Sequence, residues 1–513
     1  MAADSTHHLG RLARGGALNL AGAVVSAGAG FALVALITNT FDKATAGVLF
    51  AASSLFIVTM ALILLGTDVG LGRFVLKYTE EGRPGAVWVC VRTAFIVVAT
   101  ASLVVAFGLV IAAPSLSALM GINEAYGSAV VRIFAIALPA SAFGGLALAA
   151  TRAFGTMRPN VALDKLGRSL AQPALVAICA LSGGGILWLS VAWVLPYALL
   201  AVPAAITLYR LLRRRLPAYH EVLEGNARDV RRDFWSFTWP RSIASVSQIV
   251  IQRADIIIVA ALISPSAAAV YTAATRFVAL GKFGTQALQQ VLQPQFTQLL
   301  AARQFSTLRD VFAISAAWSV ALAWPIYLVV GCAPAVYLSL FGSGYVAPGI
   351  TTVVVMSLGM LVAIYSGPVD TLLLMSGRST ASLIVSLVAL IIDIGLCLIL
   401  IPRIGISGAA AAWAVAVVVR AVLSYALVRH SLQLSPVSRA SAITAGASLI
   451  CFAAPMLTLT LTGYATLTSF IGVAILGCVA YAGLLWLGRK TLHLRALRAL
   501  VSKRGKRTRV GVS

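Results

Sequence analysis

Long apolar stretches recur along the whole chain and constrain its fold more than any other feature. A helix needs about 20 apolar residues to cross the roughly 30 Å hydrocarbon core of a bilayer. Because 60% of the 513 residues are hydrophobic and only 11% are charged, no soluble fold could hydrate the resulting surface. The sequence predicts an all-α polytopic membrane protein. Its fourteen expected transmembrane helices are residues 15–38, 44–66, 86–112, 128–150, 161–182, 185–208, 239–262, 267–297, 310–331, 346–374, 381–401, 405–429, 438–460 and 467–487.

The distribution of lysine and arginine predicts how these helices are oriented. The first stretch lacks a small-residue cleavage site, so it is expected to be retained as a helix. With the N-terminus in the cytoplasm, 30 lysines and arginines fall in cytoplasmic segments, whereas only Lys43 and Arg403 fall outside. Positive residues favour the cytoplasmic side, so both termini are predicted to be cytoplasmic. The basic C-terminal tail, 489–513, is expected to contact anionic lipid headgroups rather than nucleic acid.

An internal repeat with a spacing of about 222 residues divides the chain. Six apolar stretches separate the equivalent positions, and this even number predicts two lobes related by an axis along the membrane normal. The matching segments are 47–53 with 269–275, 116–121 with 337–342, and 153–155 with 375–377. The predicted parts are a tail (1–14), an N-lobe of six helices (15–208), a basic cytoplasmic linker (209–238), a C-lobe of six helices (239–430), two further helices (431–488) and the basic tail (489–513).

Polar side chains form a stripe on each of the two helices expected at 239–262 and 267–297. At 100° per residue, the polar residues of the second helix share an arc about 140° wide. Those residues are Arg276, Lys282, Gln286, Gln289, Gln290 and Gln293. On the first helix, Gln248, Gln252 and Asp255 recur at helical spacing, and Arg253 lies about 100° away from that stripe. Two striped helices side by side predict a hydrated cavity between the lobes.

Cations at membrane depth are costly, which makes them candidates for function. Arg276, Lys282 and Arg253 would suit a pyrophosphate, while the glutamines would suit sugar hydroxyls. The alternative is an internal ion pair of Arg253 or Arg276 with Asp255. Asp255 could instead bind a coupling proton or sodium ion. A separate pair between Asp393 and Arg420 is expected, because the two residues lie at similar depths.

Five short segments occur in a characteristic order. They are residues 41–47, 68–73, 271–276, 340–345 and 401–410. Together they resemble landmarks of the polysaccharide-repeat (Wzx-type) flippases in the multidrug/oligosaccharidyl-lipid/polysaccharide (MOP) exporter superfamily. The resemblance implies a bacterial cytoplasmic-membrane transporter that moves a polyprenyl-pyrophosphate-linked oligosaccharide to the outer leaflet by alternating access. Polysaccharide synthesis enzymes are further candidate partners, and no catalytic residue, cofactor or metal is expected.

Several other functions compete with this prediction. A lipid II flippase would share the lobes and the cavity cations and would differ in substrate. A multidrug or cation antiporter would require cavity carboxylates, which the N-lobe scarcely offers. A membrane glycosyltransferase or glycan polymerase would require a sizeable outer loop with catalytic groups, whereas the predicted outer loops are short. A scaffold would leave the buried charges without a purpose.

Overall fold

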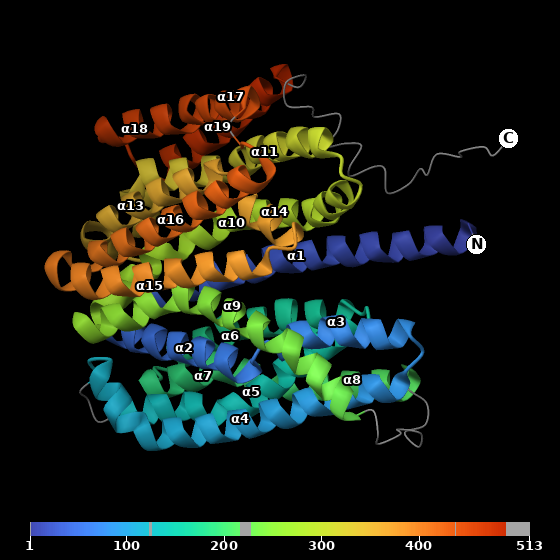
Figure 1. Cartoon of the computed structure of the whole chain (residues 1–513). Coiled ribbons are helices and arrows are strands. Elements are labelled where there is room, and N and C mark those ends of the chain that lie inside the picture. Colours follow the sequence, from blue (N-terminus) through green and yellow to red (C-terminus); the bar gives the residue numbers. More distant parts are fainter. Residues whose placement is uncertain (1, 123–125, 216–226, 437, 489–513) are drawn as a thin grey trace.

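The protein is helical throughout the part of the chain that the structure describes (Figure 1). A computed structural model describes residues 2–122, 126–215, 227–436 and 438–488. The helices of its N-terminal half are α1 (Ala2–Thr40), α2 (Lys43–Leu64), α3 (Thr67–Glu80), α4 (Pro84–Leu119), α5 (Gly127–Ala153), the π-helix η1 (Asn160–Arg168), α6 (Ser169–Leu181), α7 (Ile186–Leu199) and α8 (Ala201–Arg215). The predicted all-α class is confirmed.

The C-terminal half begins with two long helices and ends with a separate group at one edge. Its elements are α9 (Ala227–Leu262), α10 (Pro265–Ala301), α11 (Phe305–Cys332), α12 (Pro334–Ser339), the 3-10 turn η4 (Ser343–Tyr345), α13 (Val346–Tyr365), α14 (Val369–Met375), α15 (Ser379–Ile404), α16 (Ile406–Leu432), α17 (Arg439–Ser448), the π-helix η5 (Leu449–Ala453), α18 (Ala454–Leu461) and α19 (Leu467–Leu487). Figure 1 shows α4 to α8 in the lower part of the view, α10 to α16 in the upper part and α17 to α19 at the upper edge.

Equivalent landmarks of the two halves recur at the spacing found in the sequence. The helices α2 and α10 are capped alike, because Asp42 accepts a hydrogen bond from the Thr45 N–H and Ser264 accepts one from the Ala267 N–H. These two caps are 222 residues apart. Gly155 and Gly377, also 222 residues apart, both follow a helix end with φ of 78° and 81°, a conformation that glycine adopts without strain. The recurrence supports the internal repeat.

Twelve helices are long and apolar enough to cross a membrane within the described residues. The predicted stretch at 161–182 is not among them, because the three charged residues Asp164, Lys165 and Arg168 lie within the helical segment formed by η1 and α6. The predicted stretch at 267–297 lies in α10, whose arginine, lysine and glutamines lower its hydropathy. Both stretches are nevertheless helical. The count of fourteen therefore stays a prediction.

Helices extend into both sides of the predicted linker at 209–238. The helix α8 reaches Arg215, and α9 begins at Ala227 and continues without a break to Leu262. Residues 216–226 and the predicted basic tail at 489–513 lie outside the described residues. The predicted boundaries of the lobes, linker and tails stay predictions.

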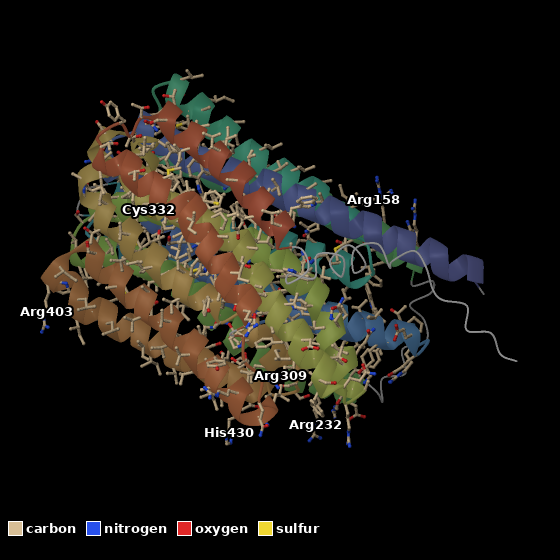
Figure 2. The ribbon with its side chains drawn as sticks, turned by 90° about the horizontal axis from the view of Figure 1, so that it is seen from above. Arg158, Arg232, Arg309, Cys332, Arg403 and His430 are labelled. Atoms are coloured by element: carbon tan, nitrogen blue, oxygen red, sulfur yellow. The ribbon has the colours of Figure 1, made fainter. Side chains whose placement is uncertain are left out.

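Basic side chains gather toward one end of the helices. In Figure 2, Arg158, Arg232 and Arg309 lie nearer to the end at which α1 begins than Arg403 and Cys332, which lie toward the left. The first three residues belong to segments predicted to be cytoplasmic, and Arg403 belongs to a predicted outer loop. The arrangement agrees with the grouping of the loops, and the sidedness itself stays a prediction.

Glycines allow the two halves to approach closely at two places. A Cβ on Gly47 of α2 would overlap the carbonyl oxygen of Pro265 at the start of α10. A Cβ on Gly70 of α3 would overlap Thr238 Oγ1 of α9 and lie 3.0 Å from the Phe234 ring. Gly47 lies near the predicted outer end of α2, whereas Gly70 follows the predicted inner end. The halves therefore meet at both ends.

Candidate functional site

A cavity of about 460 Å³ lies among helices of the C-terminal half, with Val69 of α3 also at its wall. Both polar stripes contribute to it. Six of the predicted site residues line it: Gln248 and Gln252 from α9, and Lys282, Gln286, Gln289 and Gln293 from α10. This volume falls within the range of small-molecule sites, about 300–1,000 Å³. The spacing of the stripes thus identified a large part of one wall.

The rest of the lining comes from segments that sequence analysis did not assign to the site. It includes Ser319 of α11, Asp370 of α14, Ser382 and Ser386 of α15, and Trp413 and Arg420 of α16. The helix is interrupted between α13 and α14, where Gly367 has φ of 70°. This break separates Asp370 from the apolar helix that precedes it. A glycine followed by proline, at Gly367 and Pro368, was the available sequence signal.

Lys282 is a cation that faces the cavity without a nearby carboxylate. Its Nζ lies 5.5 Å from the centre of the Trp413 ring. Among the described residues, no Asp or Glu oxygen lies within 4.0 Å of it. An aromatic ring stabilises a cation less completely than a carboxylate does. Lys282 therefore retains the capacity to attract an anion.

Arg420 pairs with a residue other than the predicted one. Its Nη2 lies 3.1 Å from Asp370 Oδ2, and the Ser424 hydroxyl donates a hydrogen bond of 2.6 Å to Asp370 Oδ1. The predicted pair of Asp393 with Arg420 is wrong. Asp393 is 1% exposed and has the thiol of Cys397 4.0 Å from its Oδ1. Depth along two helices does not specify which of their faces meet.

Four of the predicted site residues do not line this cavity. They are Arg253, Asp255, Arg276 and Gln290. Asp255 is 4% exposed, and it accepts hydrogen bonds from the Tyr271 hydroxyl at 2.6 Å and from the Ile256 N–H at 2.9 Å. The alternative ion pair of Asp255 with Arg253 or Arg276 is not present. Asp255 is held instead by neutral donors.

Arg276 lies on α10, six residues before Lys282, in the segment held by Tyr337. The Tyr337 hydroxyl donates to the Ala273 carbonyl at 2.8 Å and accepts from the Phe277 N–H at 3.1 Å. The Arg276 Nε is buried and has no hydrogen-bond partner within the described chain. Such a donor is costly unless something binds it. Arg276 and Lys282 thus share a helix but not a cavity.

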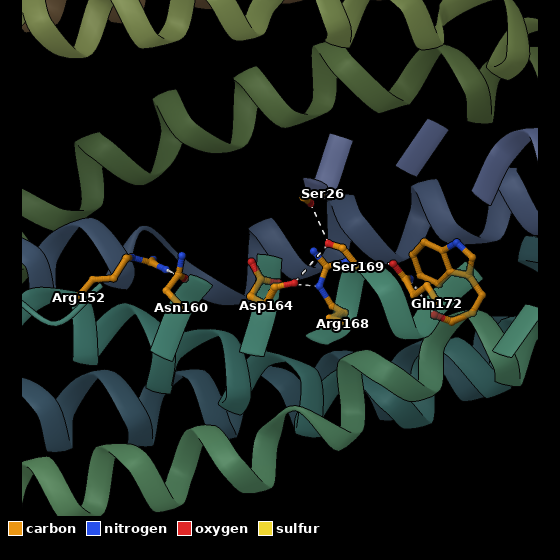
Figure 3. A network of polar contacts seen from close by, with 8 residues as sticks. Ser26, Arg152, Asn160, Asp164, Arg168, Ser169 and Gln172 are labelled. Atoms are coloured by element: carbon orange, nitrogen blue, oxygen red, sulfur yellow. Dashed lines mark hydrogen bonds and ion pairs between the residues drawn. The ribbon is translucent and has the colours of Figure 1, made fainter. Parts of the chain in front are cut away.

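A second polar network lies in the N-terminal half, and sequence analysis missed it (Figure 3). Arg168 donates to Asp164 at 2.6 Å and to Gln172 at 3.1 Å, and Gln172 in turn donates to the Trp193 carbonyl at 2.9 Å. Ser169 contacts Ser26 of α1 at 2.8 Å. The i, i+4, i+8 spacing of Asp164, Arg168 and Gln172 was the signal that could have revealed it. These polar groups satisfy one another.

Comparisons with known proteins place the chain in a family. The model of the family described as "Polysaccharide biosynthesis protein" matches residues 12–300, which is more than half of the chain. No curated protein matches the sequence.

Solved structures of MOP superfamily transporters share the fold. The lipid II flippase MurJ in an inward closed conformation is 13% identical, covers 92% of this chain and 98% of its own, and has a TM-score of 0.71. An inward-facing multidrug resistance MATE family transporter is 14% identical, with a TM-score of 0.63 over 79% of this chain and 94% of its own. A MOP superfamily transporter from Pyrococcus furiosus is 15% identical, with a TM-score of 0.54 over 84% and 96% of the two chains.

The family match and the fold agree with each other and with the resemblance seen in the sequence, which is thereby confirmed. The multiple apolar helices add that the protein is a multi-pass membrane protein. The chain belongs to the polysaccharide biosynthesis protein family and has the fold of MOP superfamily transporters.

Proposed function

We propose that the protein moves a polyprenyl-pyrophosphate-linked oligosaccharide from the cytoplasmic to the outer leaflet of the bacterial cytoplasmic membrane. The observation that carries the proposal is the cavity, which combines the unpaired Lys282 with several glutamine amides and the Trp413 ring. The cation suits a pyrophosphate, and the amides and the aromatic ring suit sugar hydroxyls and sugar faces. A cavity volume of about 460 Å³ leaves the prenyl tail in the lipid.

Each predicted site residue has a place in this proposal. Lys282 attracts the pyrophosphate, and the glutamines that line the cavity bind the glycan. Arg276, Arg253 and Gln290 contact the substrate in a state in which the two halves have moved apart. Asp255 binds the coupling proton or sodium ion. Its burial on α9, beside helices that line the cavity, supports that role.

Export in proteoliposomes tests the proposal. Lys282→Gln should reduce the flipping of a fluorescent prenyl-pyrophosphate sugar by at least about tenfold, because the loss of a charge-assisted contact costs on the order of 1.5–3 kcal/mol. Lys282→Arg should retain part of the activity, since it keeps the charge. The exposed Arg309→Gln is the control, with no change expected. Unchanged flipping in a well-folded Lys282→Gln protein would contradict the role of Lys282.

A lipid II flippase is the second candidate, and the similarity to MurJ over 92% of the chain favours it. Both substrates carry a polyprenyl pyrophosphate, so the same cavity suits either one. Mass spectrometry of lipid-linked intermediates after depletion of the protein distinguishes them. A complete glycan repeat should accumulate on its carrier if the first proposal holds. Accumulation of lipid II instead would assign the second function.

A further inference from the structure

We infer that the Asp370–Arg420 ion pair is a counter-charge which the phosphate of the substrate displaces, so that Asp370 limits affinity and assists release. The inference rests on the proposed function in one respect only, namely that the cavity receives a diphosphate. Both members of the pair line the cavity. The side chain of Asp370 is 40% exposed and that of Arg420 is 24% exposed, so an incoming anion can reach them.

The charges around the cavity explain why an anion should exchange with Asp370. The lining described by the structure holds two cations, Lys282 and Arg420, and one carboxylate, Asp370. The empty cavity is therefore partly neutralised, with Lys282 left without a carboxylate. A diphosphate carries more negative charge than Asp370 and offers several acceptor oxygens to one guanidinium. It can bind Lys282 and Arg420 together, whereas Asp370 binds Arg420 alone.

The contacts of each partner make this exchange inexpensive. Arg420 meets Asp370 through Nη2, while its Nε is buried without a hydrogen-bond partner in the described chain. This Nε would become a second donor to the anion once Arg420 turns toward it. Asp370 keeps the hydrogen bond from Ser424 when Arg420 turns away. The carboxylate then keeps one hydrogen bond and is 40% exposed, so breaking this pair costs less than breaking a fully buried one.

The position of the ion pair also allows a diphosphate to be held between Lys282 and Arg420. Asp370 belongs to the short helix α14, which begins just after the helix interruption at Gly367. Arg420 lies on α16, seven residues beyond Trp413, a rise of about 10 Å along the helix. Lys282 and Trp413 mark one part of the cavity, and the ion pair marks another. A diphosphate held between the two cations would span these parts.

Calorimetric titration of the purified full-length protein with farnesyl diphosphate tests the inference, with farnesol as the probe that lacks the charge. Asp370→Asn should bind farnesyl diphosphate at least about threefold more tightly, because no carboxylate competes for Arg420. Arg420→Gln should weaken binding by about tenfold. The double variant should behave like Arg420→Gln. Asp310→Asn, an exposed acid on α11, is the matched control and should change nothing.

A structural ion pair would give different results. Asp370→Asn would then leave the affinity unchanged or weaken it, and either outcome at an unchanged melting temperature would overturn the inference. If Asp370→Asn fails to fold, Asp370→Ser with the same titration decides the question. If the unaltered protein flips no lipid-linked sugar while Asp370→Asn binds farnesyl diphosphate more tightly, the proposed function is contradicted but the exchange is not. Normal flipping without tighter binding would contradict the exchange alone.

Discussion

Buried and half-buried polar residues of the C-terminal half differ in how they are neutralised. Asp255 receives a hydroxyl and a backbone N–H, and Arg420 receives a carboxylate. Lys282 has only an aromatic ring, while Arg276 keeps a buried donor without a partner. Two cations of one helix are thus incompletely satisfied in the described chain. Incomplete neutralisation at membrane depth favours residues that meet a ligand.

The hydrogen bond from Tyr271 to Asp255 allows the charge on this carboxyl group to be measured. Tyr271→Phe should lower the free energy of unfolding by about 1.5–3 kcal/mol if Asp255 is charged. The control is Tyr327→Phe, because the Tyr327 hydroxyl donates to the neutral Val278 carbonyl at 3.0 Å. That change should cost about 0.5–1.5 kcal/mol. Equal losses in thermal unfolding of the two purified variants would show that Asp255 is neutral.

Individual residues show how far sequence reasoning reached into the site. Helical periodicity predicted the wall formed by Gln252, Lys282 and Gln286, since periodicity fixes which residues share a face. Periodicity could not predict Asp370 as a lining residue, because the helix is interrupted at Gly367, just before Asp370. Similar depth along two helices predicted Asp393 as the partner of Arg420, whereas the observed partner is Asp370. Pairing between helices depends on their rotation about their own axes, which a single sequence does not specify.

At the scale of elements, the contact between α3 and α9 depends on one glycine. Gly70→Ala should force the two helices apart, since its Cβ would overlap Thr238 and press on Phe234. Val69 of α3 and Ser386 both line the cavity, so separating α3 from α9 should widen access to it. We therefore expect a cysteine placed at Ser386 to be labelled more rapidly. The background should lack the six native cysteines. A membrane-impermeant thiol reagent provides the measurement.

The same helix supplies the control for this experiment. Gly72 lies two residues further along α3, and a Cβ there would meet no atom within 4 Å. Gly72→Ala should therefore leave the labelling rate unchanged. If Gly70→Ala and Gly72→Ala label equally, the contact between α3 and α9 does not control access to the cavity.

Most of the helices agreed with expectation, and the exceptions have physical causes. Apolar length predicts a helix because a bilayer demands internal hydrogen bonding of the backbone. The same criterion does not distinguish α-helix from π-helix, so the nine-residue η1 was not foreseen. Nor does it reveal that α9 continues into the predicted linker, since that continuation is polar.

Orientation in the membrane is a property of the whole molecule, and two exposed serines test it. Ser343 lies in a predicted outer segment and Ser306 in a predicted cytoplasmic one, and both are exposed. In a background free of native cysteines, Ser343→Cys should react with an impermeant thiol reagent in intact cells. Ser306→Cys should react only after the cells are opened, because the excess of Lys and Arg keeps its segment inside. Labelling of Ser306→Cys in intact cells would contradict the predicted topology.

The spacing of 222 residues relates the polar network of the N-terminal half to the cavity of the C-terminal half. Ser382 and Ser386 line the cavity, and the residues 222 positions earlier are Asn160 and Asp164. In the first copy, these positions are engaged by the chain's own arginines, Arg152 and Arg168. The arginines of the N-terminal half thus occupy polar groups whose counterparts in the C-terminal half line the cavity. If the repeat reflects a duplication, we expect the N-terminal half to keep these internal contacts while the C-terminal half binds the substrate.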